Sequence, residues 1–199
     1  MNFSKKKSNT WEDHFSKKAR KERFPARSVY KLKEIQEKIN LIKKGDYVLD
    51  LGCYPGSWLK YTSELTGNKG HVVGVDLKSV SIKTPTNVTT YTKDVYQIKN
   101  DLSYFEKGFN VIISDMAPAT TGNKHVDNSR SFDLCMSALS IAEAHLLPNG
   151  SFLCKFFQGE DFNIFIDIIK KKFKHHKIFK PKSSRKSSRE IYIIGLNFL

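Results

Sequence analysis

Four ionisable residues lie within distinctive local patterns of this chain: Lys31, Asp115, Lys155 and Glu190. The patterns are RSVYKL, SDMAP, CKFFQG and SSREIYIIG, and they are spread over most of the sequence. Only tertiary structure can bring such residues together. A lysine that loses its proton among charged partners can activate a hydroxyl group. The set therefore predicts an enzyme that removes a proton from a hydroxyl.

Lys155 is the most informative member of the set. It interrupts the apolar run FLCKFF, and a buried lysine without a partner is costly. A free lysine is mostly protonated at neutral pH, so two interpretations stay open. Lys155 is either deprotonated and acts as the general base, or it stays charged and only positions the reacting oxygen. Asp115, at the end of its own apolar run, is expected to orient it.

A glycine turn for a nucleotide-like cofactor lies in VLDLGCYPGSW. Gly52 permits a tight turn after a strand, and Gly56 permits close approach of the backbone to a ligand. Asp76 ends the next predicted strand, where a carboxylate can bind ribose hydroxyls. Asp94 follows the third strand and is expected to accept a hydrogen bond from an adenine amino group, and Trp58 is expected to pack against the cofactor.

A nicotinamide-dependent oxidoreductase is an alternative, because it would also have an acidic residue at the position of Asp76. Cys53 and Tyr54 put bulk into the turn, which fits the glycine-rich turn of dinucleotide-binding domains poorly. Lys155 and the basic ends of the chain also argue against an oxidoreductase.

The elements that must position these residues alternate between strand and helix. The pattern predicts an α/β fold with a mostly parallel seven-stranded sheet, helices on both faces and an antiparallel last strand. Residues 1–24 are expected to form a basic, partly flexible extension, and 25–199 a single domain. Expected strands are 47–51, 71–76, 88–91, 109–114, 151–157, 176–180 and 191–196. Expected helices are 27–44 with a break near Asn40, 57–65, 100–105, 131–147 and 161–173, with loops at 77–87 and 117–128.

Composition narrows the class of protein. The chain has 199 residues, of which 39% are hydrophobic, and this suits one domain with a substantial core. It has no transmembrane run and no secretory signal. Three widely spaced cysteines predict reduced thiols in an intracellular protein. The cytoplasm is the default location, with a mitochondrion, another organelle or the nucleolus as alternatives. No histidine or cysteine spacing predicts a metal site.

The net charge of +14 is concentrated at the two ends of the chain. Residues 1–44 hold 14 Lys and Arg against 5 Asp and Glu, and residues 170–190 hold 10 against 1. Such segments suit a polyanion better than a membrane surface, because none forms a clean basic amphipathic helix. We expect RNA as the partner and a monomeric protein. The candidate phosphate contacts are Arg23, Arg27, Lys180, Lys182, Arg185 and Arg189.

Taken together, these motifs resemble the FtsJ/RrmJ family of RNA 2′-O-ribose methyltransferases. RSVYKLKEI, DLGCYPGSW, SDMAP, KFFQGEDF and KPKSSRKSSREIYII occur in the order of the family, from about Trp11 to Ile194. The resemblance implies a Rossmann-like fold, S-adenosylmethionine as cofactor, S-adenosylhomocysteine as product and no required metal. Departures are small: Ser57 stands where many relatives have glycine, and Cys53-Tyr54 replace smaller residues.

The resemblance also implies specific roles. It identifies a catalytic tetrad formed by Lys31, Asp115, Lys155 and Glu190. It places cofactor contacts at Gly56, Trp58, Asp76, Asp94 and Asp115. SDMAP and SSREIYII favour the branch that methylates a uridine of large-subunit ribosomal RNA. The alternatives are a tRNA 2′-O-methyltransferase and a non-catalytic ribosome-assembly factor that binds RNA.

Overall fold

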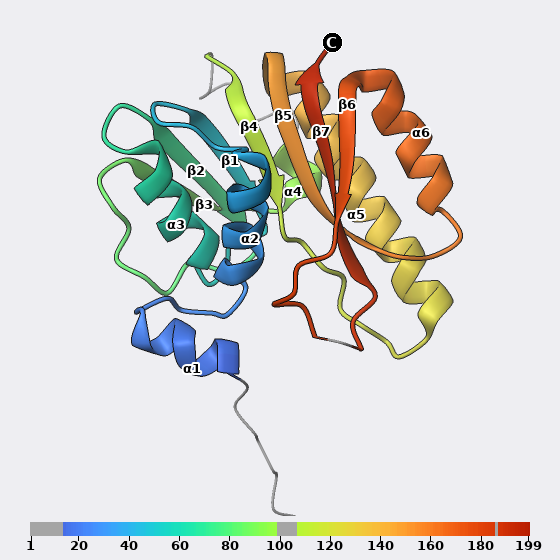
Figure 1. Ribbon diagram of the computed structural model, residues 1–199, viewed down its shortest axis with the longest axis horizontal. Helices are drawn as coiled ribbons and strands as arrows, with labels where there is room; N and C mark the ends of the chain where they lie inside the picture. Colours follow the sequence, from blue (N-terminus) through green and yellow to red (C-terminus); the bar gives the residue numbers. More distant parts are fainter. Residues whose placement is uncertain (1–13, 99–106, 186) are drawn as a thin grey trace, which may run out of the picture.

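The computed structural model describes residues 14–98, 107–185 and 187–199. A seven-stranded sheet carries helices on both faces (Figure 1). The helices are α1 (His14–Lys21), α2 (Val29–Ile39), α3 (Ser57–Thr66), α4 (Val95–Ile98), α5 (Lys124–His145) and α6 (Phe162–Lys172). The strands are β1 (Tyr47–Leu51), β2 (His71–Asp76), β3 (Val88–Thr92), β4 (Phe109–Ser114), β5 (Leu146–Phe157), β6 (Phe173–Phe179) and β7 (Glu190–Phe198).

The order of the strands is β3-β2-β1-β4-β5-β7-β6. The first five are parallel to their neighbours, and β7 is antiparallel to both β5 and β6. The carboxyl ends of the parallel strands therefore meet at one edge, and β7 begins at that same edge. The predicted α/β fold, with its mostly parallel seven-stranded sheet and antiparallel last strand, is confirmed.

Two apolar layers hold the helices against the sheet. On one face, Leu32 and Ile35 of α2 and Leu59 of α3 are fully buried. On the other face, Ala138 of α5 and Phe165 of α6 are fully buried. The strands are apolar on both sides because both faces are covered. Burial of this apolar surface is the main source of stability. The three cysteines are also buried and free.

Helix α5 is longer than its apolar pattern predicts. The sequence predicted a loop over 117–128 and a helix from Ser131, but the helix starts at Lys124. Asn123 caps it, and its side-chain oxygen accepts hydrogen bonds from the backbone N–H groups of His125 and Val126. The first turns are mostly exposed, so they carry no apolar periodicity, and the cap decides where the helix begins.

Two further segments differ in detail from the predicted elements. Residues 1–24 were expected to form a basic, partly flexible extension, and within them His14–Lys21 forms the helix α1, with Ala19 and Phe24 buried against Tyr30 of α2. Strand β5 begins at Leu146 rather than at Ser151. The expected break near Asn40 is confirmed, because that residue is left-handed (φ 51°) and ends α2. The helix expected at 100–105 lies outside the described residues.

Candidate active site

The register of β5 and β7 brings two of the four predicted residues to the catalytic edge. Lys155 pairs with Tyr192, and Phe157 pairs with Glu190. Residues directly opposite each other in an antiparallel pair share a face of the sheet. Lys155 and Tyr192 therefore point to the same side. Tyr192 packs in the apolar layer beneath α2 and α3, so Lys155 faces the helix that carries Lys31.

Lys155 is held by a single residue through two contacts. Its ammonium nitrogen lies 3.0 Å from Asp115 Oδ1 and also donates to the backbone carbonyl of Asp115. The lysine is 8% exposed, so water cannot replace these partners fully. The Tyr192 hydroxyl donates to the same Oδ1 at 2.7 Å. Asp115 thus links two buried side chains of neighbouring strands.

Lys31 and Glu190 form the other half of the cluster. Lys31 Nζ lies 2.6 Å from Glu190 Oε1, and the Ser184 hydroxyl donates to that oxygen at 2.7 Å. Helix α2 supplies the lysine, and β7 together with the loop before it supplies its partners. Glu190 lies at the start of β7, and the antiparallel direction of that strand brings it to the catalytic edge.

Charges within the cluster set the ionisation of its acids. Burial raises the pKa of Asp115, but Lys155 and Lys31 outweigh burial and hold it below its ordinary value. The pKa of Glu190 is also below its ordinary value, because the charge of Lys31 outweighs burial, which alone would raise it. Burial, followed by the charge of Asp115, raises the pKa of Tyr192 well above its ordinary value. Both acids are therefore anionic at neutral pH, and Tyr192 is a neutral hydrogen-bond donor.

Three of the four residues line one of two cavities, and Lys155 contacts Asp115 of the first. One, the cofactor cavity, has a volume of about 310 Å³ and is lined in part by Gly52, Asp76, Asp94 and Asp115. The other, the catalytic cavity, has a volume of about 420 Å³ and is lined by Lys31 and Glu190 together with Arg27, Ser28, Arg185, Ser187 and Ser188.

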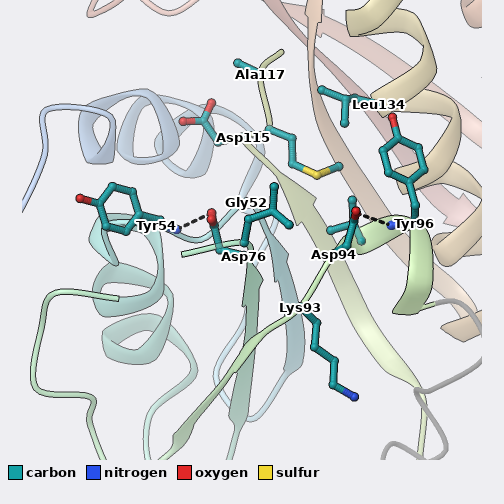
Figure 2. A pocket seen from close by; sticks show the side chains of 12 residues that line it. Gly52, Tyr54, Asp76, Lys93, Asp94, Tyr96, Asp115, Ala117 and Leu134 are labelled. Carbon is teal, nitrogen blue, oxygen red and sulfur yellow. Dashed lines mark hydrogen bonds between the residues drawn. The ribbon is translucent and has the colours of Figure 1, made fainter. Parts of the chain in front are cut away.

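Figure 2 shows how the cofactor cavity is built from strand ends. Asp76, at the end of β2, accepts hydrogen bonds from the backbone N–H groups of Tyr54 and Lys78, both at 2.9 Å. Asp94 accepts from the N–H of Tyr96 at 3.0 Å. Each carboxylate oxygen can accept a further hydrogen bond. The two acids can therefore receive hydroxyl or amino groups of a nucleoside.

Gly52 keeps the wall of the cavity open. Its φ is +78°, and a Cβ there would lie 2.6 Å from the Met116 side chain. A methyl group at this point would be both strained and crowded. The open wall at Gly52 and the two strand-end carboxylates fit the nucleoside part of S-adenosylmethionine.

Two predicted cofactor residues do not line the cofactor cavity. The Trp58 indole is 3% exposed, lies tilted against the Tyr192 ring and donates to the Ser28 carbonyl. Its ring is part of the core, and its contact with a cofactor stays a prediction. Gly56 is left-handed (φ +108°), and a Cβ there would meet Ile82 at 2.8 Å. The glycine therefore permits close packing of the loop that carries Ile82, and its approach to a ligand stays a prediction.

Two of the six predicted RNA contacts, Arg27 and Arg185, line the catalytic cavity. Arg27 lines the cavity and donates to the Ser183 carbonyl. Arg185 also lines it. Arg189 is half-buried and donates to the Asn128 side chain at 3.0 Å, so it braces α5. The remaining three are exposed: Arg23, Lys180 and Lys182.

Sequence reasoning missed Tyr192, Ser184 and Tyr96. Tyr192 was included in SSREIYIIG only as part of an apolar strand. The available signal was its spacing two residues after Glu190, which puts both on one face of a strand. Tyr96 lines the cofactor cavity (Figure 2), and nothing in its local sequence distinguishes it from an ordinary exposed tyrosine.

No group of three or more His, Cys, Asp and Glu in the described part of the chain is arranged to hold a metal ion. Over the same residues, no helix is long and apolar enough to cross a membrane.

A mostly parallel sheet with one antiparallel strand, a nucleoside-shaped cavity at its carboxyl edge and a Lys-Asp-Lys-Glu cluster beside it define a Rossmann-like methyltransferase. The family model of FtsJ-like methyltransferases matches residues 24–198. The chain belongs to that family, as its motifs predicted.

Relatives of known name agree with this assignment. A ribosomal RNA large subunit methyltransferase E from Desulforapulum autotrophicum is 53% identical over 97% of this chain and 96% of its own. The protein of that name from Lawsonia intracellularis is 44% identical over 94% and 96%. A solved ribosomal RNA methyltransferase from Plasmodium falciparum superposes with a TM-score of 0.79, at 31% identity over 88% of this chain and 99% of its own.

Proposed function

We propose that this protein transfers a methyl group from S-adenosylmethionine to the 2′-hydroxyl of a uridine ribose in large-subunit ribosomal RNA. The observation that carries the proposal is the Lys155–Asp115 contact at the carboxyl edge of the sheet, where Asp115 lines the cofactor cavity. Relatives that match nearly the whole chain are named for large-subunit ribosomal RNA, and they supply the choice of RNA. Because they are bacterial, we infer that the reaction takes place in the cytoplasm.

S-adenosylmethionine, when bound, supplies a methyl group that is already activated for transfer. The protein must then hold the ribose hydroxyl in line and receive its proton. Asp76 and Asp94 would hold the ribose and adenine of the cofactor, and Gly52 and Met116 would form the wall beneath them. The cavity needs no metal to fulfil these roles.

Lys155 is the group that we assign to the acceptor hydroxyl. Its nitrogen donates two hydrogen bonds to Asp115. A neutral amine fixed in this way directs its lone pair away from Asp115 and can take the proton. An ammonium fixed in the same way directs its third N–H there and can only position the oxygen. Both roles fit this geometry, and the substitution Lys155→Arg separates them.

Lys31 and Glu190 would hold the acceptor ribose from the other side. Their ion pair is largely buried and lines the catalytic cavity. A cation there stabilises negative charge that develops on the hydroxyl oxygen as its proton leaves. Glu190 in turn keeps the ammonium of Lys31 in place.

The arginines of the catalytic cavity suit a phosphate backbone. Both Arg27, just before α2, and Arg185, on the loop before β7, line this cavity. Contacts between arginine and phosphate release counterions, so RNA affinity should fall steeply as salt increases. The same affinity at low and moderate salt would contradict this surface.

The proposal is tested by methyl transfer from labelled S-adenosylmethionine. The substrates are large ribosomal subunits from cells that lack this methylation, and bulk tRNA, followed by mapping of the labelled nucleotide. Label at the ribose of a large-subunit uridine is the expected result. Label only in tRNA would keep the chemistry and overturn the substrate. No transfer to either RNA would favour a non-catalytic assembly role.

A further inference from the structure

A second groove opens beside the catalytic cavity and has no place in the mechanism. It lies between α1, α2 and the end of β6, and its volume is about 460 Å³. We call it the side groove. Its aromatic lining is Phe15, Tyr30 and Phe179, and its basic lining includes Lys38, Lys180 and Lys182.

The side groove continues the catalytic cavity along the same two walls. Helix α2 gives Lys31 to the cavity and Lys38 to the groove, two turns further along one face of the helix. At 1.5 Å per residue, this separation is about 10 Å. The segment after β6 gives Lys180 and Lys182 to the groove and Arg185 to the cavity.

A tether between these walls separates the two sites. The Glu34 carboxylate accepts hydrogen bonds from the backbone N–H groups of Lys182 and Ser183, at 2.7 and 2.8 Å. Arg27 donates to the carbonyl of Ser183 from the other side. The tether fixes the 182–183 backbone against α2. The walls of the groove are therefore set before any ligand arrives.

The charges inside the groove favour an anion. Its lining holds five lysines, at 18, 33, 38, 180 and 182, against Glu34 and Glu37. Glu34 is engaged by the tether, and Lys33 is engaged with Glu22 at 2.8 Å. Among the described residues, the ammonium groups of Lys38 and Lys182 form no ion pair and are exposed. Both can meet a phosphate.

The aromatic rings select the kind of anion. Phe15 and Phe179 are half-buried and reach the groove, and rings in a basic groove are the usual platform for unpaired bases. A duplex would hide its bases from them. We propose that the side groove binds a single-stranded nucleotide that flanks the methylated one, with its base against these rings and its phosphate at Lys38 and Lys182. This inference rests on the proposed function. It predicts that the RNA runs across the protein from the catalytic cavity to the side groove.

The test uses the full-length protein and a fluorescein-labelled ten-nucleotide oligouridylate, with a ten-base-pair RNA duplex as comparison. Affinity is measured at several salt concentrations. The variant Lys38→Ala/Lys182→Ala should bind the single strand on the order of tenfold more weakly, with a salt slope smaller by about 1.4. Phe179→Leu should weaken single-strand binding by about fivefold at an unchanged slope, because it removes only the stacking surface.

The matched control is Lys44→Ala/Lys69→Ala, which removes two exposed lysines just before β1 and β2, at the opposite edge of the sheet. Equal effects of the groove and control variants would overturn the proposal. It would also be overturned if the groove variants bound the single strand as tightly as the wild type. If the wild type transfers no methyl group to any RNA, the proposed function itself fails, whatever the binding data show.

Discussion

Lys155 Nζ lies 3.0 Å from Asp115 Oδ1, on a side chain that is 8% exposed. The pair joins the carboxyl ends of two adjacent strands, β4 and β5, and Asp115 lines the cofactor cavity. Loss of one partner would leave the other charge buried without compensation, which costs free energy of folding. Lys155 and Asp115 therefore stabilise each other.

Lys155→Met should lower kcat by about 10² to 10⁴-fold, because the group that receives or orients the hydroxyl proton is lost. The affinity for S-adenosylmethionine should stay near that of the wild type, since Asp76 and Asp94 are intact. Single-turnover methylation and calorimetric binding of the cofactor measure the two effects. Normal turnover in this variant would remove Lys155 from the mechanism.

Lys155→Arg separates the two roles of the lysine. Arginine keeps a positive charge and hydrogen-bond donors but cannot be deprotonated in a protein. If Lys155 is the general base, the arginine variant should be as inactive as the methionine variant. If Lys155 only positions the oxygen, the arginine variant should retain clearly more activity than the methionine variant in the same single-turnover assay.

Tyr192→Phe should leave the fold intact and weaken the reaction. The substitution removes the hydroxyl that donates to Asp115 at 2.7 Å and keeps the ring that stacks near Trp58. We expect a loss of about 1–2 kcal/mol in the free energy of unfolding and a kcat lower by about tenfold. Urea denaturation and steady-state kinetics test these values. An unchanged kcat would mean that Lys155 alone orients Asp115.

Gly52→Ala should impair binding of the cofactor. The added methyl group meets Met116 at a left-handed position, so we expect affinity for S-adenosylmethionine to fall by at least about tenfold. Gly45→Ala is the control, because Gly45 has a similar φ of +89° but open space around its Cβ position. The Gly45→Ala variant has the same backbone strain as Gly52→Ala but no clash with a neighbouring side chain. Equal affinities in the two variants would show that the wall at Met116 is not part of the site.

Asp50 predicts an unusual dependence of stability on pH. It is fully buried in β1, and neither carboxylate oxygen has a hydrogen-bond partner within the described structure. Burial, followed by the charges of Asp115 and Asp76, raises its pKa well above the ordinary 3.8. A raised pKa means that the folded state holds a proton that the unfolded state releases. Its contribution to stability is therefore complete below pH 3.8 and is lost as pH rises towards the folded pKa.

Asp50→Asn removes this titration. The free energy of unfolding of the variant, relative to the wild type, should increase with pH above about 4, by up to about 1.4 kcal/mol per pH unit. Urea denaturation at pH 4.5, 5.5 and 7 measures the difference. A difference that stays constant with pH would mean that Asp50 is ionised in the folded protein.

The order of the strands and of the longer helices, and the four catalytic candidates, could be predicted from the sequence, because they depend on local patterns. The short helices α1 and α4 were not predicted. Apolar runs of strand length marked the buried strands, and the residues that follow them fell at the carboxyl edge by the rule of parallel sheets. The start of α5 could not be found in this way, since its exposed first turns have no apolar face and only the Asn123 cap defines them.

Tertiary structure decided the rest. Local patterns in the chain predicted the family and the fold class, and they marked Lys31, Asp115, Lys155 and Glu190 as candidates. The contact between Asp115 and Lys155 was also expected. The hydrogen bond from Tyr192 to Asp115 was not, because it depends on the β5–β7 register, which places Tyr192 opposite Lys155. The side to which the Trp58 ring points could not be predicted either, since an aromatic beside a glycine turn can face a ligand or the core, and in the folded chain the ring lies in the core near Tyr192. The side groove belongs to no motif, because its walls come from segments about 150 residues apart that meet only in the folded chain.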